Sequence, residues 1–405
     1  MIPTTLLSPE ARLLLHSMEP APDMATVSAL LQDPQFDWDC LVNLAQKEKA
    51  TTSLSNMLRR VPRDAMPPER AAQVSRLSAV TQFRMLHLEQ LLAGALETLA
   101  DRGIDVLLLK GAGLAVSAYG SFSARPMYDV DLLVRPGQAE EAWNVLREAG
   151  WSHDEDECPM SKYDTHHHYP PLDDPSRTGL SLELHASPCD STTGLTGEAM
   201  WRDARRVRVH GQEAWVPGEA HQVVHLSVHF AWSHCLGSAA WRTVRDVRQV
   251  TESDTFNWQD LLAVVRQTRT ATSCYWTLRL ARTLGGVMVP DEVLRALRPP
   301  RMEPFLRILE RHYISNLFRF SPAACPSESL NRVLWSAGLA PRWSGHGAVR
   351  PWTRDDELAS EGTASSRTRG KRLAAHTERL GWWTRYLGGV LIGSHASAGR
   401  VSTAR

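Results

Sequence analysis

The chain has 405 residues, enough for two or three domains, and its 45 Lys and Arg residues balance its 45 Asp and Glu residues. A net charge of zero gives no argument for a general nucleic-acid or membrane binder, although local charged patches are possible, so a nucleic-acid partner is possible but not favoured. Partners must therefore be inferred from individual sites.

The six cysteines lie far apart and include no C-x-x-C pair, which argues against a zinc ribbon and against a disulfide framework. Residues 1–20 lack a basic start followed by a long apolar stretch, and no run of about 18 apolar residues occurs. We therefore expect a cytoplasmic protein with no membrane partner.

Residues 1–103 are expected to form a helical N-terminal domain. From Thr26 onward the apolar residues recur at three- and four-residue spacing, which is the period of an amphipathic helix. The prolines of VPRDAMPPER (61–70) interrupt this pattern, and Arg102 with Gly103 gives a stop signal before Ile104.

Residues 104–217 are expected to form a small sheet domain. Short apolar runs separated by turns predict strands, a helix is expected at 138–150, and RRVRVHGQEAWVP (205–217) reads as a hairpin with Gly211 at its turn. This mixture predicts the α+β class, with a minimal mixed sheet flanked by helical domains.

Helical spacing returns over residues 218–320, which predicts a helical C-terminal domain. Residues 321–405 are expected to be an extension. Within it, the polar stretch 358–372 reads as a flexible linker, and LGWWTRYLGGVLIG (380–393) is apolar enough to dock back on the body.

Two aspartates stand one residue apart in an apolar run, in the stretch YDVDLLV. In a strand Asp129 and Asp131 would project from one face, where they repel each other unless a cation lies between them. Their oxygens suit Mg²⁺. Glu183 in LSLELHAS is the candidate third acid, on condition that its strand neighbours the first, and His185 would share its face.

Lys110, Gly111, Ala112 and Gly113 follow the apolar strand IDVLLL and precede a helical segment. A glycine-containing turn at a helix N-terminus lets backbone N–H groups approach phosphate oxygens. The Walker A spacing is absent, so the turn gains its meaning from its closeness to the aspartates.

These features together resemble the nucleotidyltransferase superfamily typified by DNA polymerase beta. More narrowly, LLKG, then R-x-x-x-D-x-D-L-L-V, then an E-x-H strand resemble a bacterial family of uncharacterised nucleotidyltransferases, over roughly residues 35–260. The toxin-type nucleotidyltransferases of abortive-infection systems look similar at the K-G turn and the aspartate motif.

The resemblance implies a role for each matching residue. Asp129, Asp131 and Glu183 would be the catalytic residues and the ligands of Mg²⁺, with two ions expected, and the substrate would be an NTP, with ATP favoured. The nucleotide-binding residues would be Lys110, Gly111, Ala112 and Arg125.

The histidines leave several interpretations open. His221, His225 and His229 are spaced by four on one helix face, which fits either a zinc site or, as we favour, a packed polar face lining the substrate cleft. His166 to His168 precede an expected strand, in which alternation would separate His167 from the other two. The possible cleft residues are His168, His185, His225 and His229.

Two charged groups in the same half of the chain invite structural interpretations. Asp246 is expected to pair with Arg242 or Arg245, or to cap local structure, rather than to catalyse. The arginines of the segment 202–208 could receive a phosphate-bearing acceptor, but a solvated surface is the favoured interpretation.

The sequence thus favours a metal-dependent nucleotidyltransferase whose acceptor is a small molecule or peptide-derived metabolite. One alternative is a toxin-like enzyme that modifies tRNA or protein, for which the zero net charge is unfavourable. The other is a catalytically silent nucleotide-binding protein, an alternative that rests on Ala112 in the turn.

Overall fold

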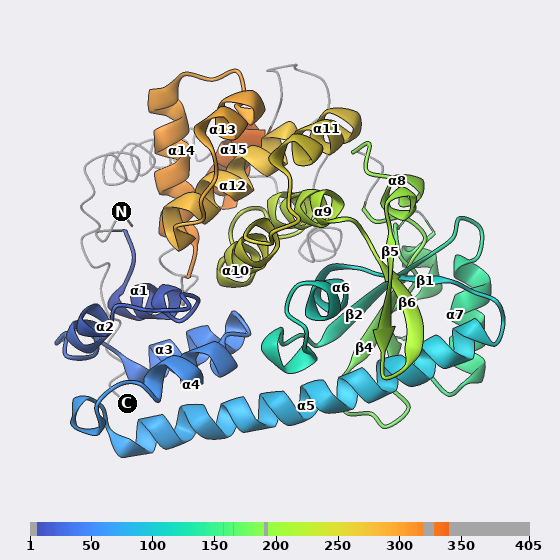
Figure 1. The fold of residues 1–405 in the computed structure, drawn as a ribbon, viewed down its shortest axis with the longest axis horizontal. Coiled ribbons are helices and arrows are strands. Elements are labelled where there is room, and N and C mark those ends of the chain that lie inside the picture. Colours follow the sequence, from blue (N-terminus) through green and yellow to red (C-terminus); the bar gives the residue numbers. More distant parts are fainter. Residues whose placement is uncertain (1–5, 157, 165, 190–192, 319–327, 340–405) are drawn as a thin grey trace, which may run out of the picture.

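The computed structural model describes residues 6–156, 158–164, 166–189, 193–318 and 328–339. In this part of the chain, helices flank one mixed sheet (Figure 1), which confirms the predicted α+β class. The sequence predictions for 358–372 and 380–393 lie outside the described residues. No helix within the described ranges combines the length and the apolar character needed to cross a membrane.

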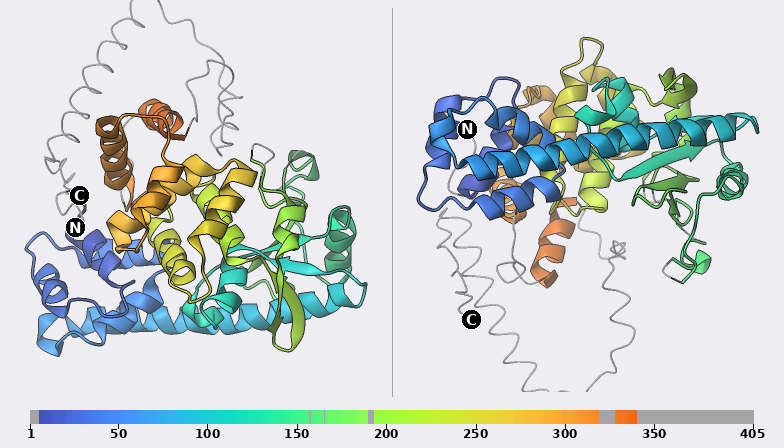
Figure 2. Two further views of the ribbon diagram at one scale, coloured as in Figure 1. Left: turned by 45° about the horizontal axis from the view of Figure 1, so that its top comes forward. Right: turned by 90° about the horizontal axis from the view of Figure 1, so that it is seen from below.

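The N-terminal helices lead into one long helix. They are α1 (Pro9–His16), α2 (Met24–Leu31), α3 (Trp38–Lys47), α4 (Thr51–Leu58) and α5 (Pro68–Ala100), with a 3₁₀ turn η1 (Arg63–Ala65) in the proline-rich break. Pro68 begins α5, where the missing N–H has no intrahelical partner to lose. Helix α5 runs along the molecule from α1–α4 to the sheet, as Figure 1 and the view from below in Figure 2 both show.

Six strands form the sheet in the order β3-β4-β2-β1-β6-β5. They are β1 (Val106–Leu108), β2 (Asp129–Val134), β3 (Leu172–Asp173), β4 (Ser181–His185), β5 (Arg205–Val209) and β6 (Gln212–Val216). Strand β2 pairs antiparallel with β1 and parallel with β4. Strands β5 and β6 form the predicted hairpin, and its turn residues His210 and Gly211 have positive φ.

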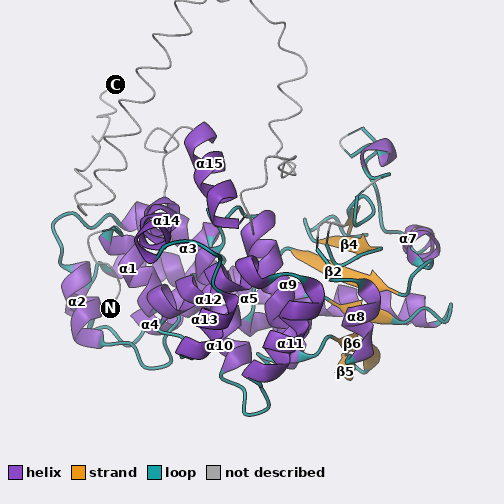
Figure 3. Cartoon of the chain, turned by 90° about the horizontal axis from the view of Figure 1, so that it is seen from above, coloured by secondary structure: helices purple, strands orange, loops and turns teal. Residues whose placement is uncertain are grey.

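Short helices connect the strands, and longer ones follow the sheet. The connecting helices are α6 (Lys110–Ser117), α7 (Ala139–Glu148) and α8 (Gly197–Arg202), with the 3₁₀ turns η2 (Phe122–Ala124) and η3 (Met160–Lys162). The C-terminal helices are α9 (Glu219–Trp232), α10 (Ala240–Thr251), α11 (Trp258–Thr268), α12 (Ala271–Gly285), α13 (Asp291–Leu297), α14 (Glu303–Asn316) and α15 (Glu328–Leu339). Figure 3 shows the strands gathered at one end of the molecule, with most of the helices at the other.

Alternation along the central strands divides the core into two clusters. Val130 and Leu132 of β2 pack in a cluster with α5 and α7, whereas Leu133 packs in a second cluster with the C-terminal helices. Both faces of β2 are therefore covered, and the odd-numbered residues of β2 face the C-terminal helices.

The N-terminal and C-terminal helices share that second cluster. Leu13 and Leu14 of α1 belong to it together with Trp241 of α10, and the Trp241 indole Nε1 donates a hydrogen bond to the Leu14 carbonyl oxygen at 2.9 Å. Glu48 accepts from the backbone N–H of Trp241 at 3.1 Å. Together these contacts fix the loop between α3 and α4 against the start of α10.

Candidate functional site

Three acids and a histidine lie on one face of two adjacent strands. The parallel register of β2 and β4 sets Asp131 opposite Glu183 and Leu133 opposite His185. Because side chains two residues apart share a face, Asp129 also points to the side of the C-terminal helices. The condition set for Glu183, that its strand neighbours the one carrying the aspartates, is therefore met.

Asp131 is the buried centre of this group, with 4% of its side chain exposed. One of its oxygens accepts from the Lys110 ammonium at 2.7 Å and from the His185 ring Nε2 at 2.9 Å. Burial alone would raise the pKa of Asp131, but the charge of Lys110 and the bond from His185 hold that pKa well below its usual range. Asp131 is therefore ionised and already paired.

Glu183 has the opposite electrostatic setting. Burial and the neighbouring charge of Asp131 raise the pKa of Glu183 to about 8. Its Oε2 atom lies 3.8 Å from Nε2 of His185 and 4.0 Å from Nε2 of His168. Two acids with pKa values driven apart in this way are typical of functional sites.

Asp129 is more open, with 51% of its side chain exposed, and it pairs with a residue from the N-terminal helices. The Lys49 ammonium donates to Asp129 Oδ1 at 3.1 Å and lies 4.8 Å from the centre of the Tyr128 ring. Although burial opposes it, the charge of Lys49 lowers the pKa of Asp129. Sequence reasoning missed Lys49, because the helical pattern around it indicates only packing.

The predicted glycine turn is in fact the first turn of α6, which starts at Lys110 directly after β1. The Leu109 N–H donates to the Asp131 carbonyl oxygen at 2.9 Å, and no side chain among the described residues caps the helix N-terminus. A Cβ at Gly113 would lie 2.5 Å from the Leu108 carbonyl oxygen, so this glycine lets the helix approach the strand. Ala112 is buried in the core, which leaves its backbone rather than its side chain for ligand contacts.

Arg125 is held by a carboxylate from α10. Its Nε and Nη2 atoms each donate to Asp246 at 2.7 Å, and Tyr119 Oη donates to the same carboxylate at 2.8 Å. The expectation that Asp246 pairs with Arg242 or Arg245 is wrong, because Arg125 reaches it from the segment before β2. Arg125 thus ties the start of β2 to α10.

Arg242 was also overlooked as a site residue. In the described part of the chain its side chain has no hydrogen bond or ion pair, and burial and the nearby Arg125 lower its pKa. The charges of Glu48 and Asp129 act on it as well, which puts Arg242 at the same end of the site as Lys49. With Lys110, these two residues make three cations around the acids.

The histidines divide into two sets. His166, His167 and His168 bring ligand atoms within 4.8 Å of one another, so the predicted separation of His167 is wrong; the segment is bent rather than an extended strand. His225 Nε2 donates to the Pro188 carbonyl oxygen at 2.9 Å, and His229 packs against His234. Burial lowers the pKa of His225 to about 3 and, together with Lys110, keeps that of His229 well below its usual range.

Two groups in the described ranges could hold a metal ion: the one formed by His166, His167 and His168, and the one formed by Asp131, Glu183 and His185. Neither includes the α9 histidines, so no zinc site is found there among the described residues. Three carboxylates suit a hard divalent cation. A cation would also offset the repulsion that raises the pKa of Glu183.

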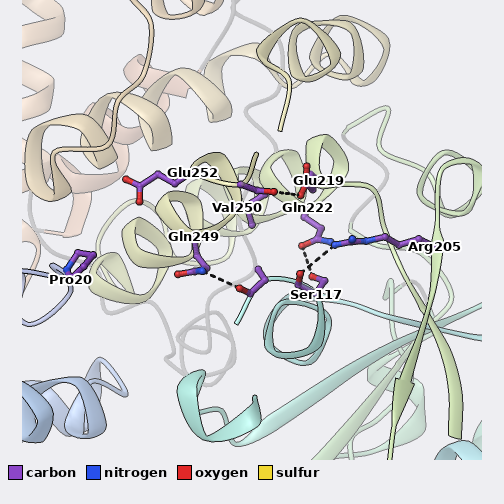
Figure 4. Close-up of a pocket in the computed structure, with 10 residues that line it drawn as sticks. Pro20, Ser117, Arg205, Glu219, Gln222, Gln249, Val250 and Glu252 are labelled. Carbon is purple, nitrogen blue, oxygen red and sulfur yellow. Dashed lines mark hydrogen bonds between the residues drawn. The ribbon is translucent and has the colours of Figure 1, made fainter. Parts of the chain in front are cut away.

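A polar pocket of about 440 Å³ lies at the far end of α6 from Lys110, about 10 Å away along the helix axis. Figure 4 shows the Arg205 side chain, which donates to the Ser117 carbonyl oxygen at 3.3 Å, and the hydroxyl of Ser117, which contacts Gln222. Arg205 thus lines a pocket that is separate from the acids.

Comparison with known proteins gave one informative result. A family model described as an uncharacterised nucleotidyltransferase matches residues 34–286, more than half of the chain. The matched span includes Lys49, Lys110, the acids of β2 and β4, and Arg242. No curated protein and no solved structure gave a significant match.

Proposed function

Because the chain belongs to the family of uncharacterised nucleotidyltransferases, we propose that it transfers a nucleoside monophosphate from an NTP to an acceptor at Asp129, Asp131 and Glu183. The observation that carries the proposal is the register of β2 and β4, which brings Asp131 opposite Glu183. Beside these acids, the N-terminus of α6, which no described side chain caps, and three cations suit a triphosphate.

Asp129, Asp131 and Glu183 would hold the divalent ions, with Mg²⁺ expected and two ions proposed, because carboxylate oxygens are the ligands that this ion prefers. When bound, such ions supply positive charge that stabilises the attacking and leaving oxygens of a phosphoryl displacement. His185 orients Asp131 through the 2.9 Å hydrogen bond. The Lys110 ammonium donates to the same oxygen at 2.7 Å, so two donors fix the direction of the carboxylate.

The phosphate-binding groups come from three parts of the chain. The first-turn N–H groups of α6 offer donors at the positive end of a helix dipole. Lys49 from the loop after α3 and Arg242 from α10 add charge on the side of Asp129. Such preorganised cations stabilise the charge that develops on a transferred phosphoryl group.

In the proposed reaction an acceptor oxygen attacks the α-phosphorus of the NTP. The bond from that phosphorus to the bridging oxygen breaks, and pyrophosphate leaves with the electron pair. The acceptor gives up its proton to Glu183, which must first have lost its own proton. The products are the nucleotidylated acceptor, pyrophosphate and one proton.

We propose ATP as the donor and a small molecule or peptide-derived metabolite as the acceptor. The test incubates the protein with each α-³²P-labelled NTP, Mg²⁺ and a fractionated cell extract. Label should move to an acceptor with the wild type and should fail to move with Asp129→Asn or Asp131→Asn, whereas Asp173→Asn, an exposed change on β3, should retain transfer.

Each alternative has its own result in this test. Label found in tRNA or in protein would replace the small-molecule acceptor by a macromolecule. Tight Mg²⁺-dependent NTP binding without transfer in any fraction would indicate a silent nucleotide-binding protein. Equal transfer by the wild type and by Asp131→Asn would reject the site.

A further inference from the structure

The His168 ring brings one of its nitrogens close to Glu183. Its Nδ1 contacts the Tyr169 carbonyl oxygen at 2.7 Å, and because a carbonyl oxygen only accepts, Nδ1 carries the proton. The Nδ1–H bond to that carbonyl leaves Nε2 as the ring nitrogen that can bind a ligand. That Nε2 atom lies 4.0 Å from Oε2 of Glu183. A backbone carbonyl that fixes the tautomer is the usual outer partner of a metal-binding histidine.

The backbone holds His168 at this position. Its main chain forms a single antiparallel bridge with His185, and the next residue, Tyr169, donates its N–H to the Leu184 carbonyl oxygen at 2.8 Å. The rings of His168 and His185 are 5.2 Å apart. Both imidazoles are therefore fixed beside β4.

The two rings nevertheless offer different atoms to a ligand. His185 contacts the Asp131 carboxylate through Nε2 at 2.9 Å and the Ser187 carbonyl oxygen through Nδ1 at 3.3 Å. The shorter contact, to a charged acceptor, places a proton on Nε2, so His185 orients the carboxylate and presents no lone pair there. His168 presents its Nε2 lone pair beside Glu183. Metal bonds of about 2.1 Å set neighbouring ligands of one ion about 3.0–3.4 Å apart. The two atoms, observed 4.0 Å apart, would therefore have to approach each other by about 0.6–1.0 Å.

We propose that His168 is a nitrogen ligand of the ion bound at Asp131 and Glu183, and that this position takes a first-row transition ion such as Mn²⁺ in preference to Mg²⁺. The proposal rests on the proposed function, because it concerns an ion at the same acids. Mg²⁺ prefers oxygen ligands and strict octahedral geometry, whereas imidazole suits transition ions. One imidazole ligand in a carboxylate site therefore shifts the metal preference of the site from Mg²⁺ toward Mn²⁺.

The test uses the full chain and Mn²⁺ as the probe. Binding is followed by the loss of the six-line EPR signal of free Mn²⁺, and three-pulse electron spin echo modulation reports a ¹⁴N nucleus bound to the ion. The variants are His168→Gln and His168→Asn, with His167→Gln as the matched control from the same segment. Circular dichroism and thermal melting check that each variant is folded.

The wild type and His167→Gln should show ¹⁴N modulation, and both His168 variants should lose it. The variants should also bind Mn²⁺ at least about tenfold more weakly, the loss expected when a metal site loses a supporting group. Asp131→Asn should weaken binding too. Mg²⁺ should displace Mn²⁺ from the wild type only in large excess.

Four results would overturn the proposal: no Mn²⁺ bound, bound Mn²⁺ without ¹⁴N modulation in the wild type, modulation that persists in both His168 variants, or equal loss in His167→Gln. The last would place the ion among His166, His167 and His168 instead. Mg²⁺-dependent label transfer that Asp131→Asn abolishes would keep the proposed function even if ¹⁴N modulation is absent. Bound Mn²⁺ with ¹⁴N modulation, but no label transfer by the wild type, would support His168 as a ligand and would reject nucleotidyl transfer.

Discussion

The buried pair of Arg125 and Asp246 offers a sharp test of how the strand that carries the aspartates is held. Asp246→Asn keeps the shape of the side chain but removes its charge, which leaves the Arg125 guanidinium without a countercharge. The two side chains are 10% and 1% exposed and share two hydrogen bonds of 2.7 Å. Removing one partner of such a buried pair costs about 3–5 kcal/mol in free energy of unfolding.

A surface pair gives the matched control. Arg102 and Glu148 lie 3.1 Å apart with 54% and 67% of their side chains exposed, so Glu148→Gln should cost less than about 1 kcal/mol. The double variant Arg125→Met with Asp246→Leu removes both charges and should recover most of the loss, because apolar groups of similar volume can replace a buried ion pair.

The assay is urea unfolding, followed by tryptophan fluorescence and by circular dichroism, with coincident transitions required before free energies are compared. Equal losses for Asp246→Asn and Glu148→Gln would refute the structural role of the pair. A double variant less stable than Asp246→Asn would refute the argument that the unpaired charge is the cause.

Three further predictions follow from single positions. Gly113→Ala should destabilise the protein in urea unfolding, because the new Cβ would lie 2.5 Å from a backbone carbonyl oxygen. Gly94→Ala in α5 places its Cβ in open space and should stabilise the protein by about 0.5–1 kcal/mol. A Gly113→Ala variant more stable than Gly94→Ala would contradict the close approach of α6 to β1. Lys49→Met should raise the KM for NTP at least about tenfold in steady-state transfer, because a charge-assisted contact to the phosphates is lost. Lys47→Met, at an exposed position of α3, should leave the KM unchanged. Equal effects of the two variants on the KM would remove Lys49 from the site. Burial raises the pKa of Glu48 above its usual value of 4.5, so the stability that Glu48 contributes is fully present below pH 4.5 and is lost as pH rises through the pKa of the folded state. Glu48→Gln should reduce this loss of melting temperature in a pH series. Parallel curves for the wild type and the variant would contradict the raised pKa of Glu48.

The fold class followed from local periodicity, because each element satisfies its own pattern of apolar residues. The proline break before α5, the stop at Gly103 and the hairpin at Gly211 are all local signals, and the structure confirms them. The shared core of the N-terminal and C-terminal helices was not predictable in this way. The hydrogen bond from Trp241 to the Leu14 carbonyl oxygen joins residues more than 200 positions apart, and nothing in either helix pattern specifies the other.

The same distinction applies to the site. Asp129, Asp131 and Glu183 could be singled out because the strand period of two places acids on one face, and the register brings the strands together. Lys49 and the pairing of Arg125 with Asp246 depend on how helices dock, so charge type alone does not reveal their partners. The tautomer of His168 depends on one backbone carbonyl that the sequence does not indicate.

The position of the label in the products tests the central claim most directly. Nucleotidyl transfer predicts that the acceptor gains the label of α-³²P-ATP and that the label of γ-³²P-ATP appears in pyrophosphate, with both lost in Asp131→Asn. Label from γ-³²P-ATP on the acceptor, with α-label left in ADP, would mean transfer of the terminal phosphate and would contradict the account.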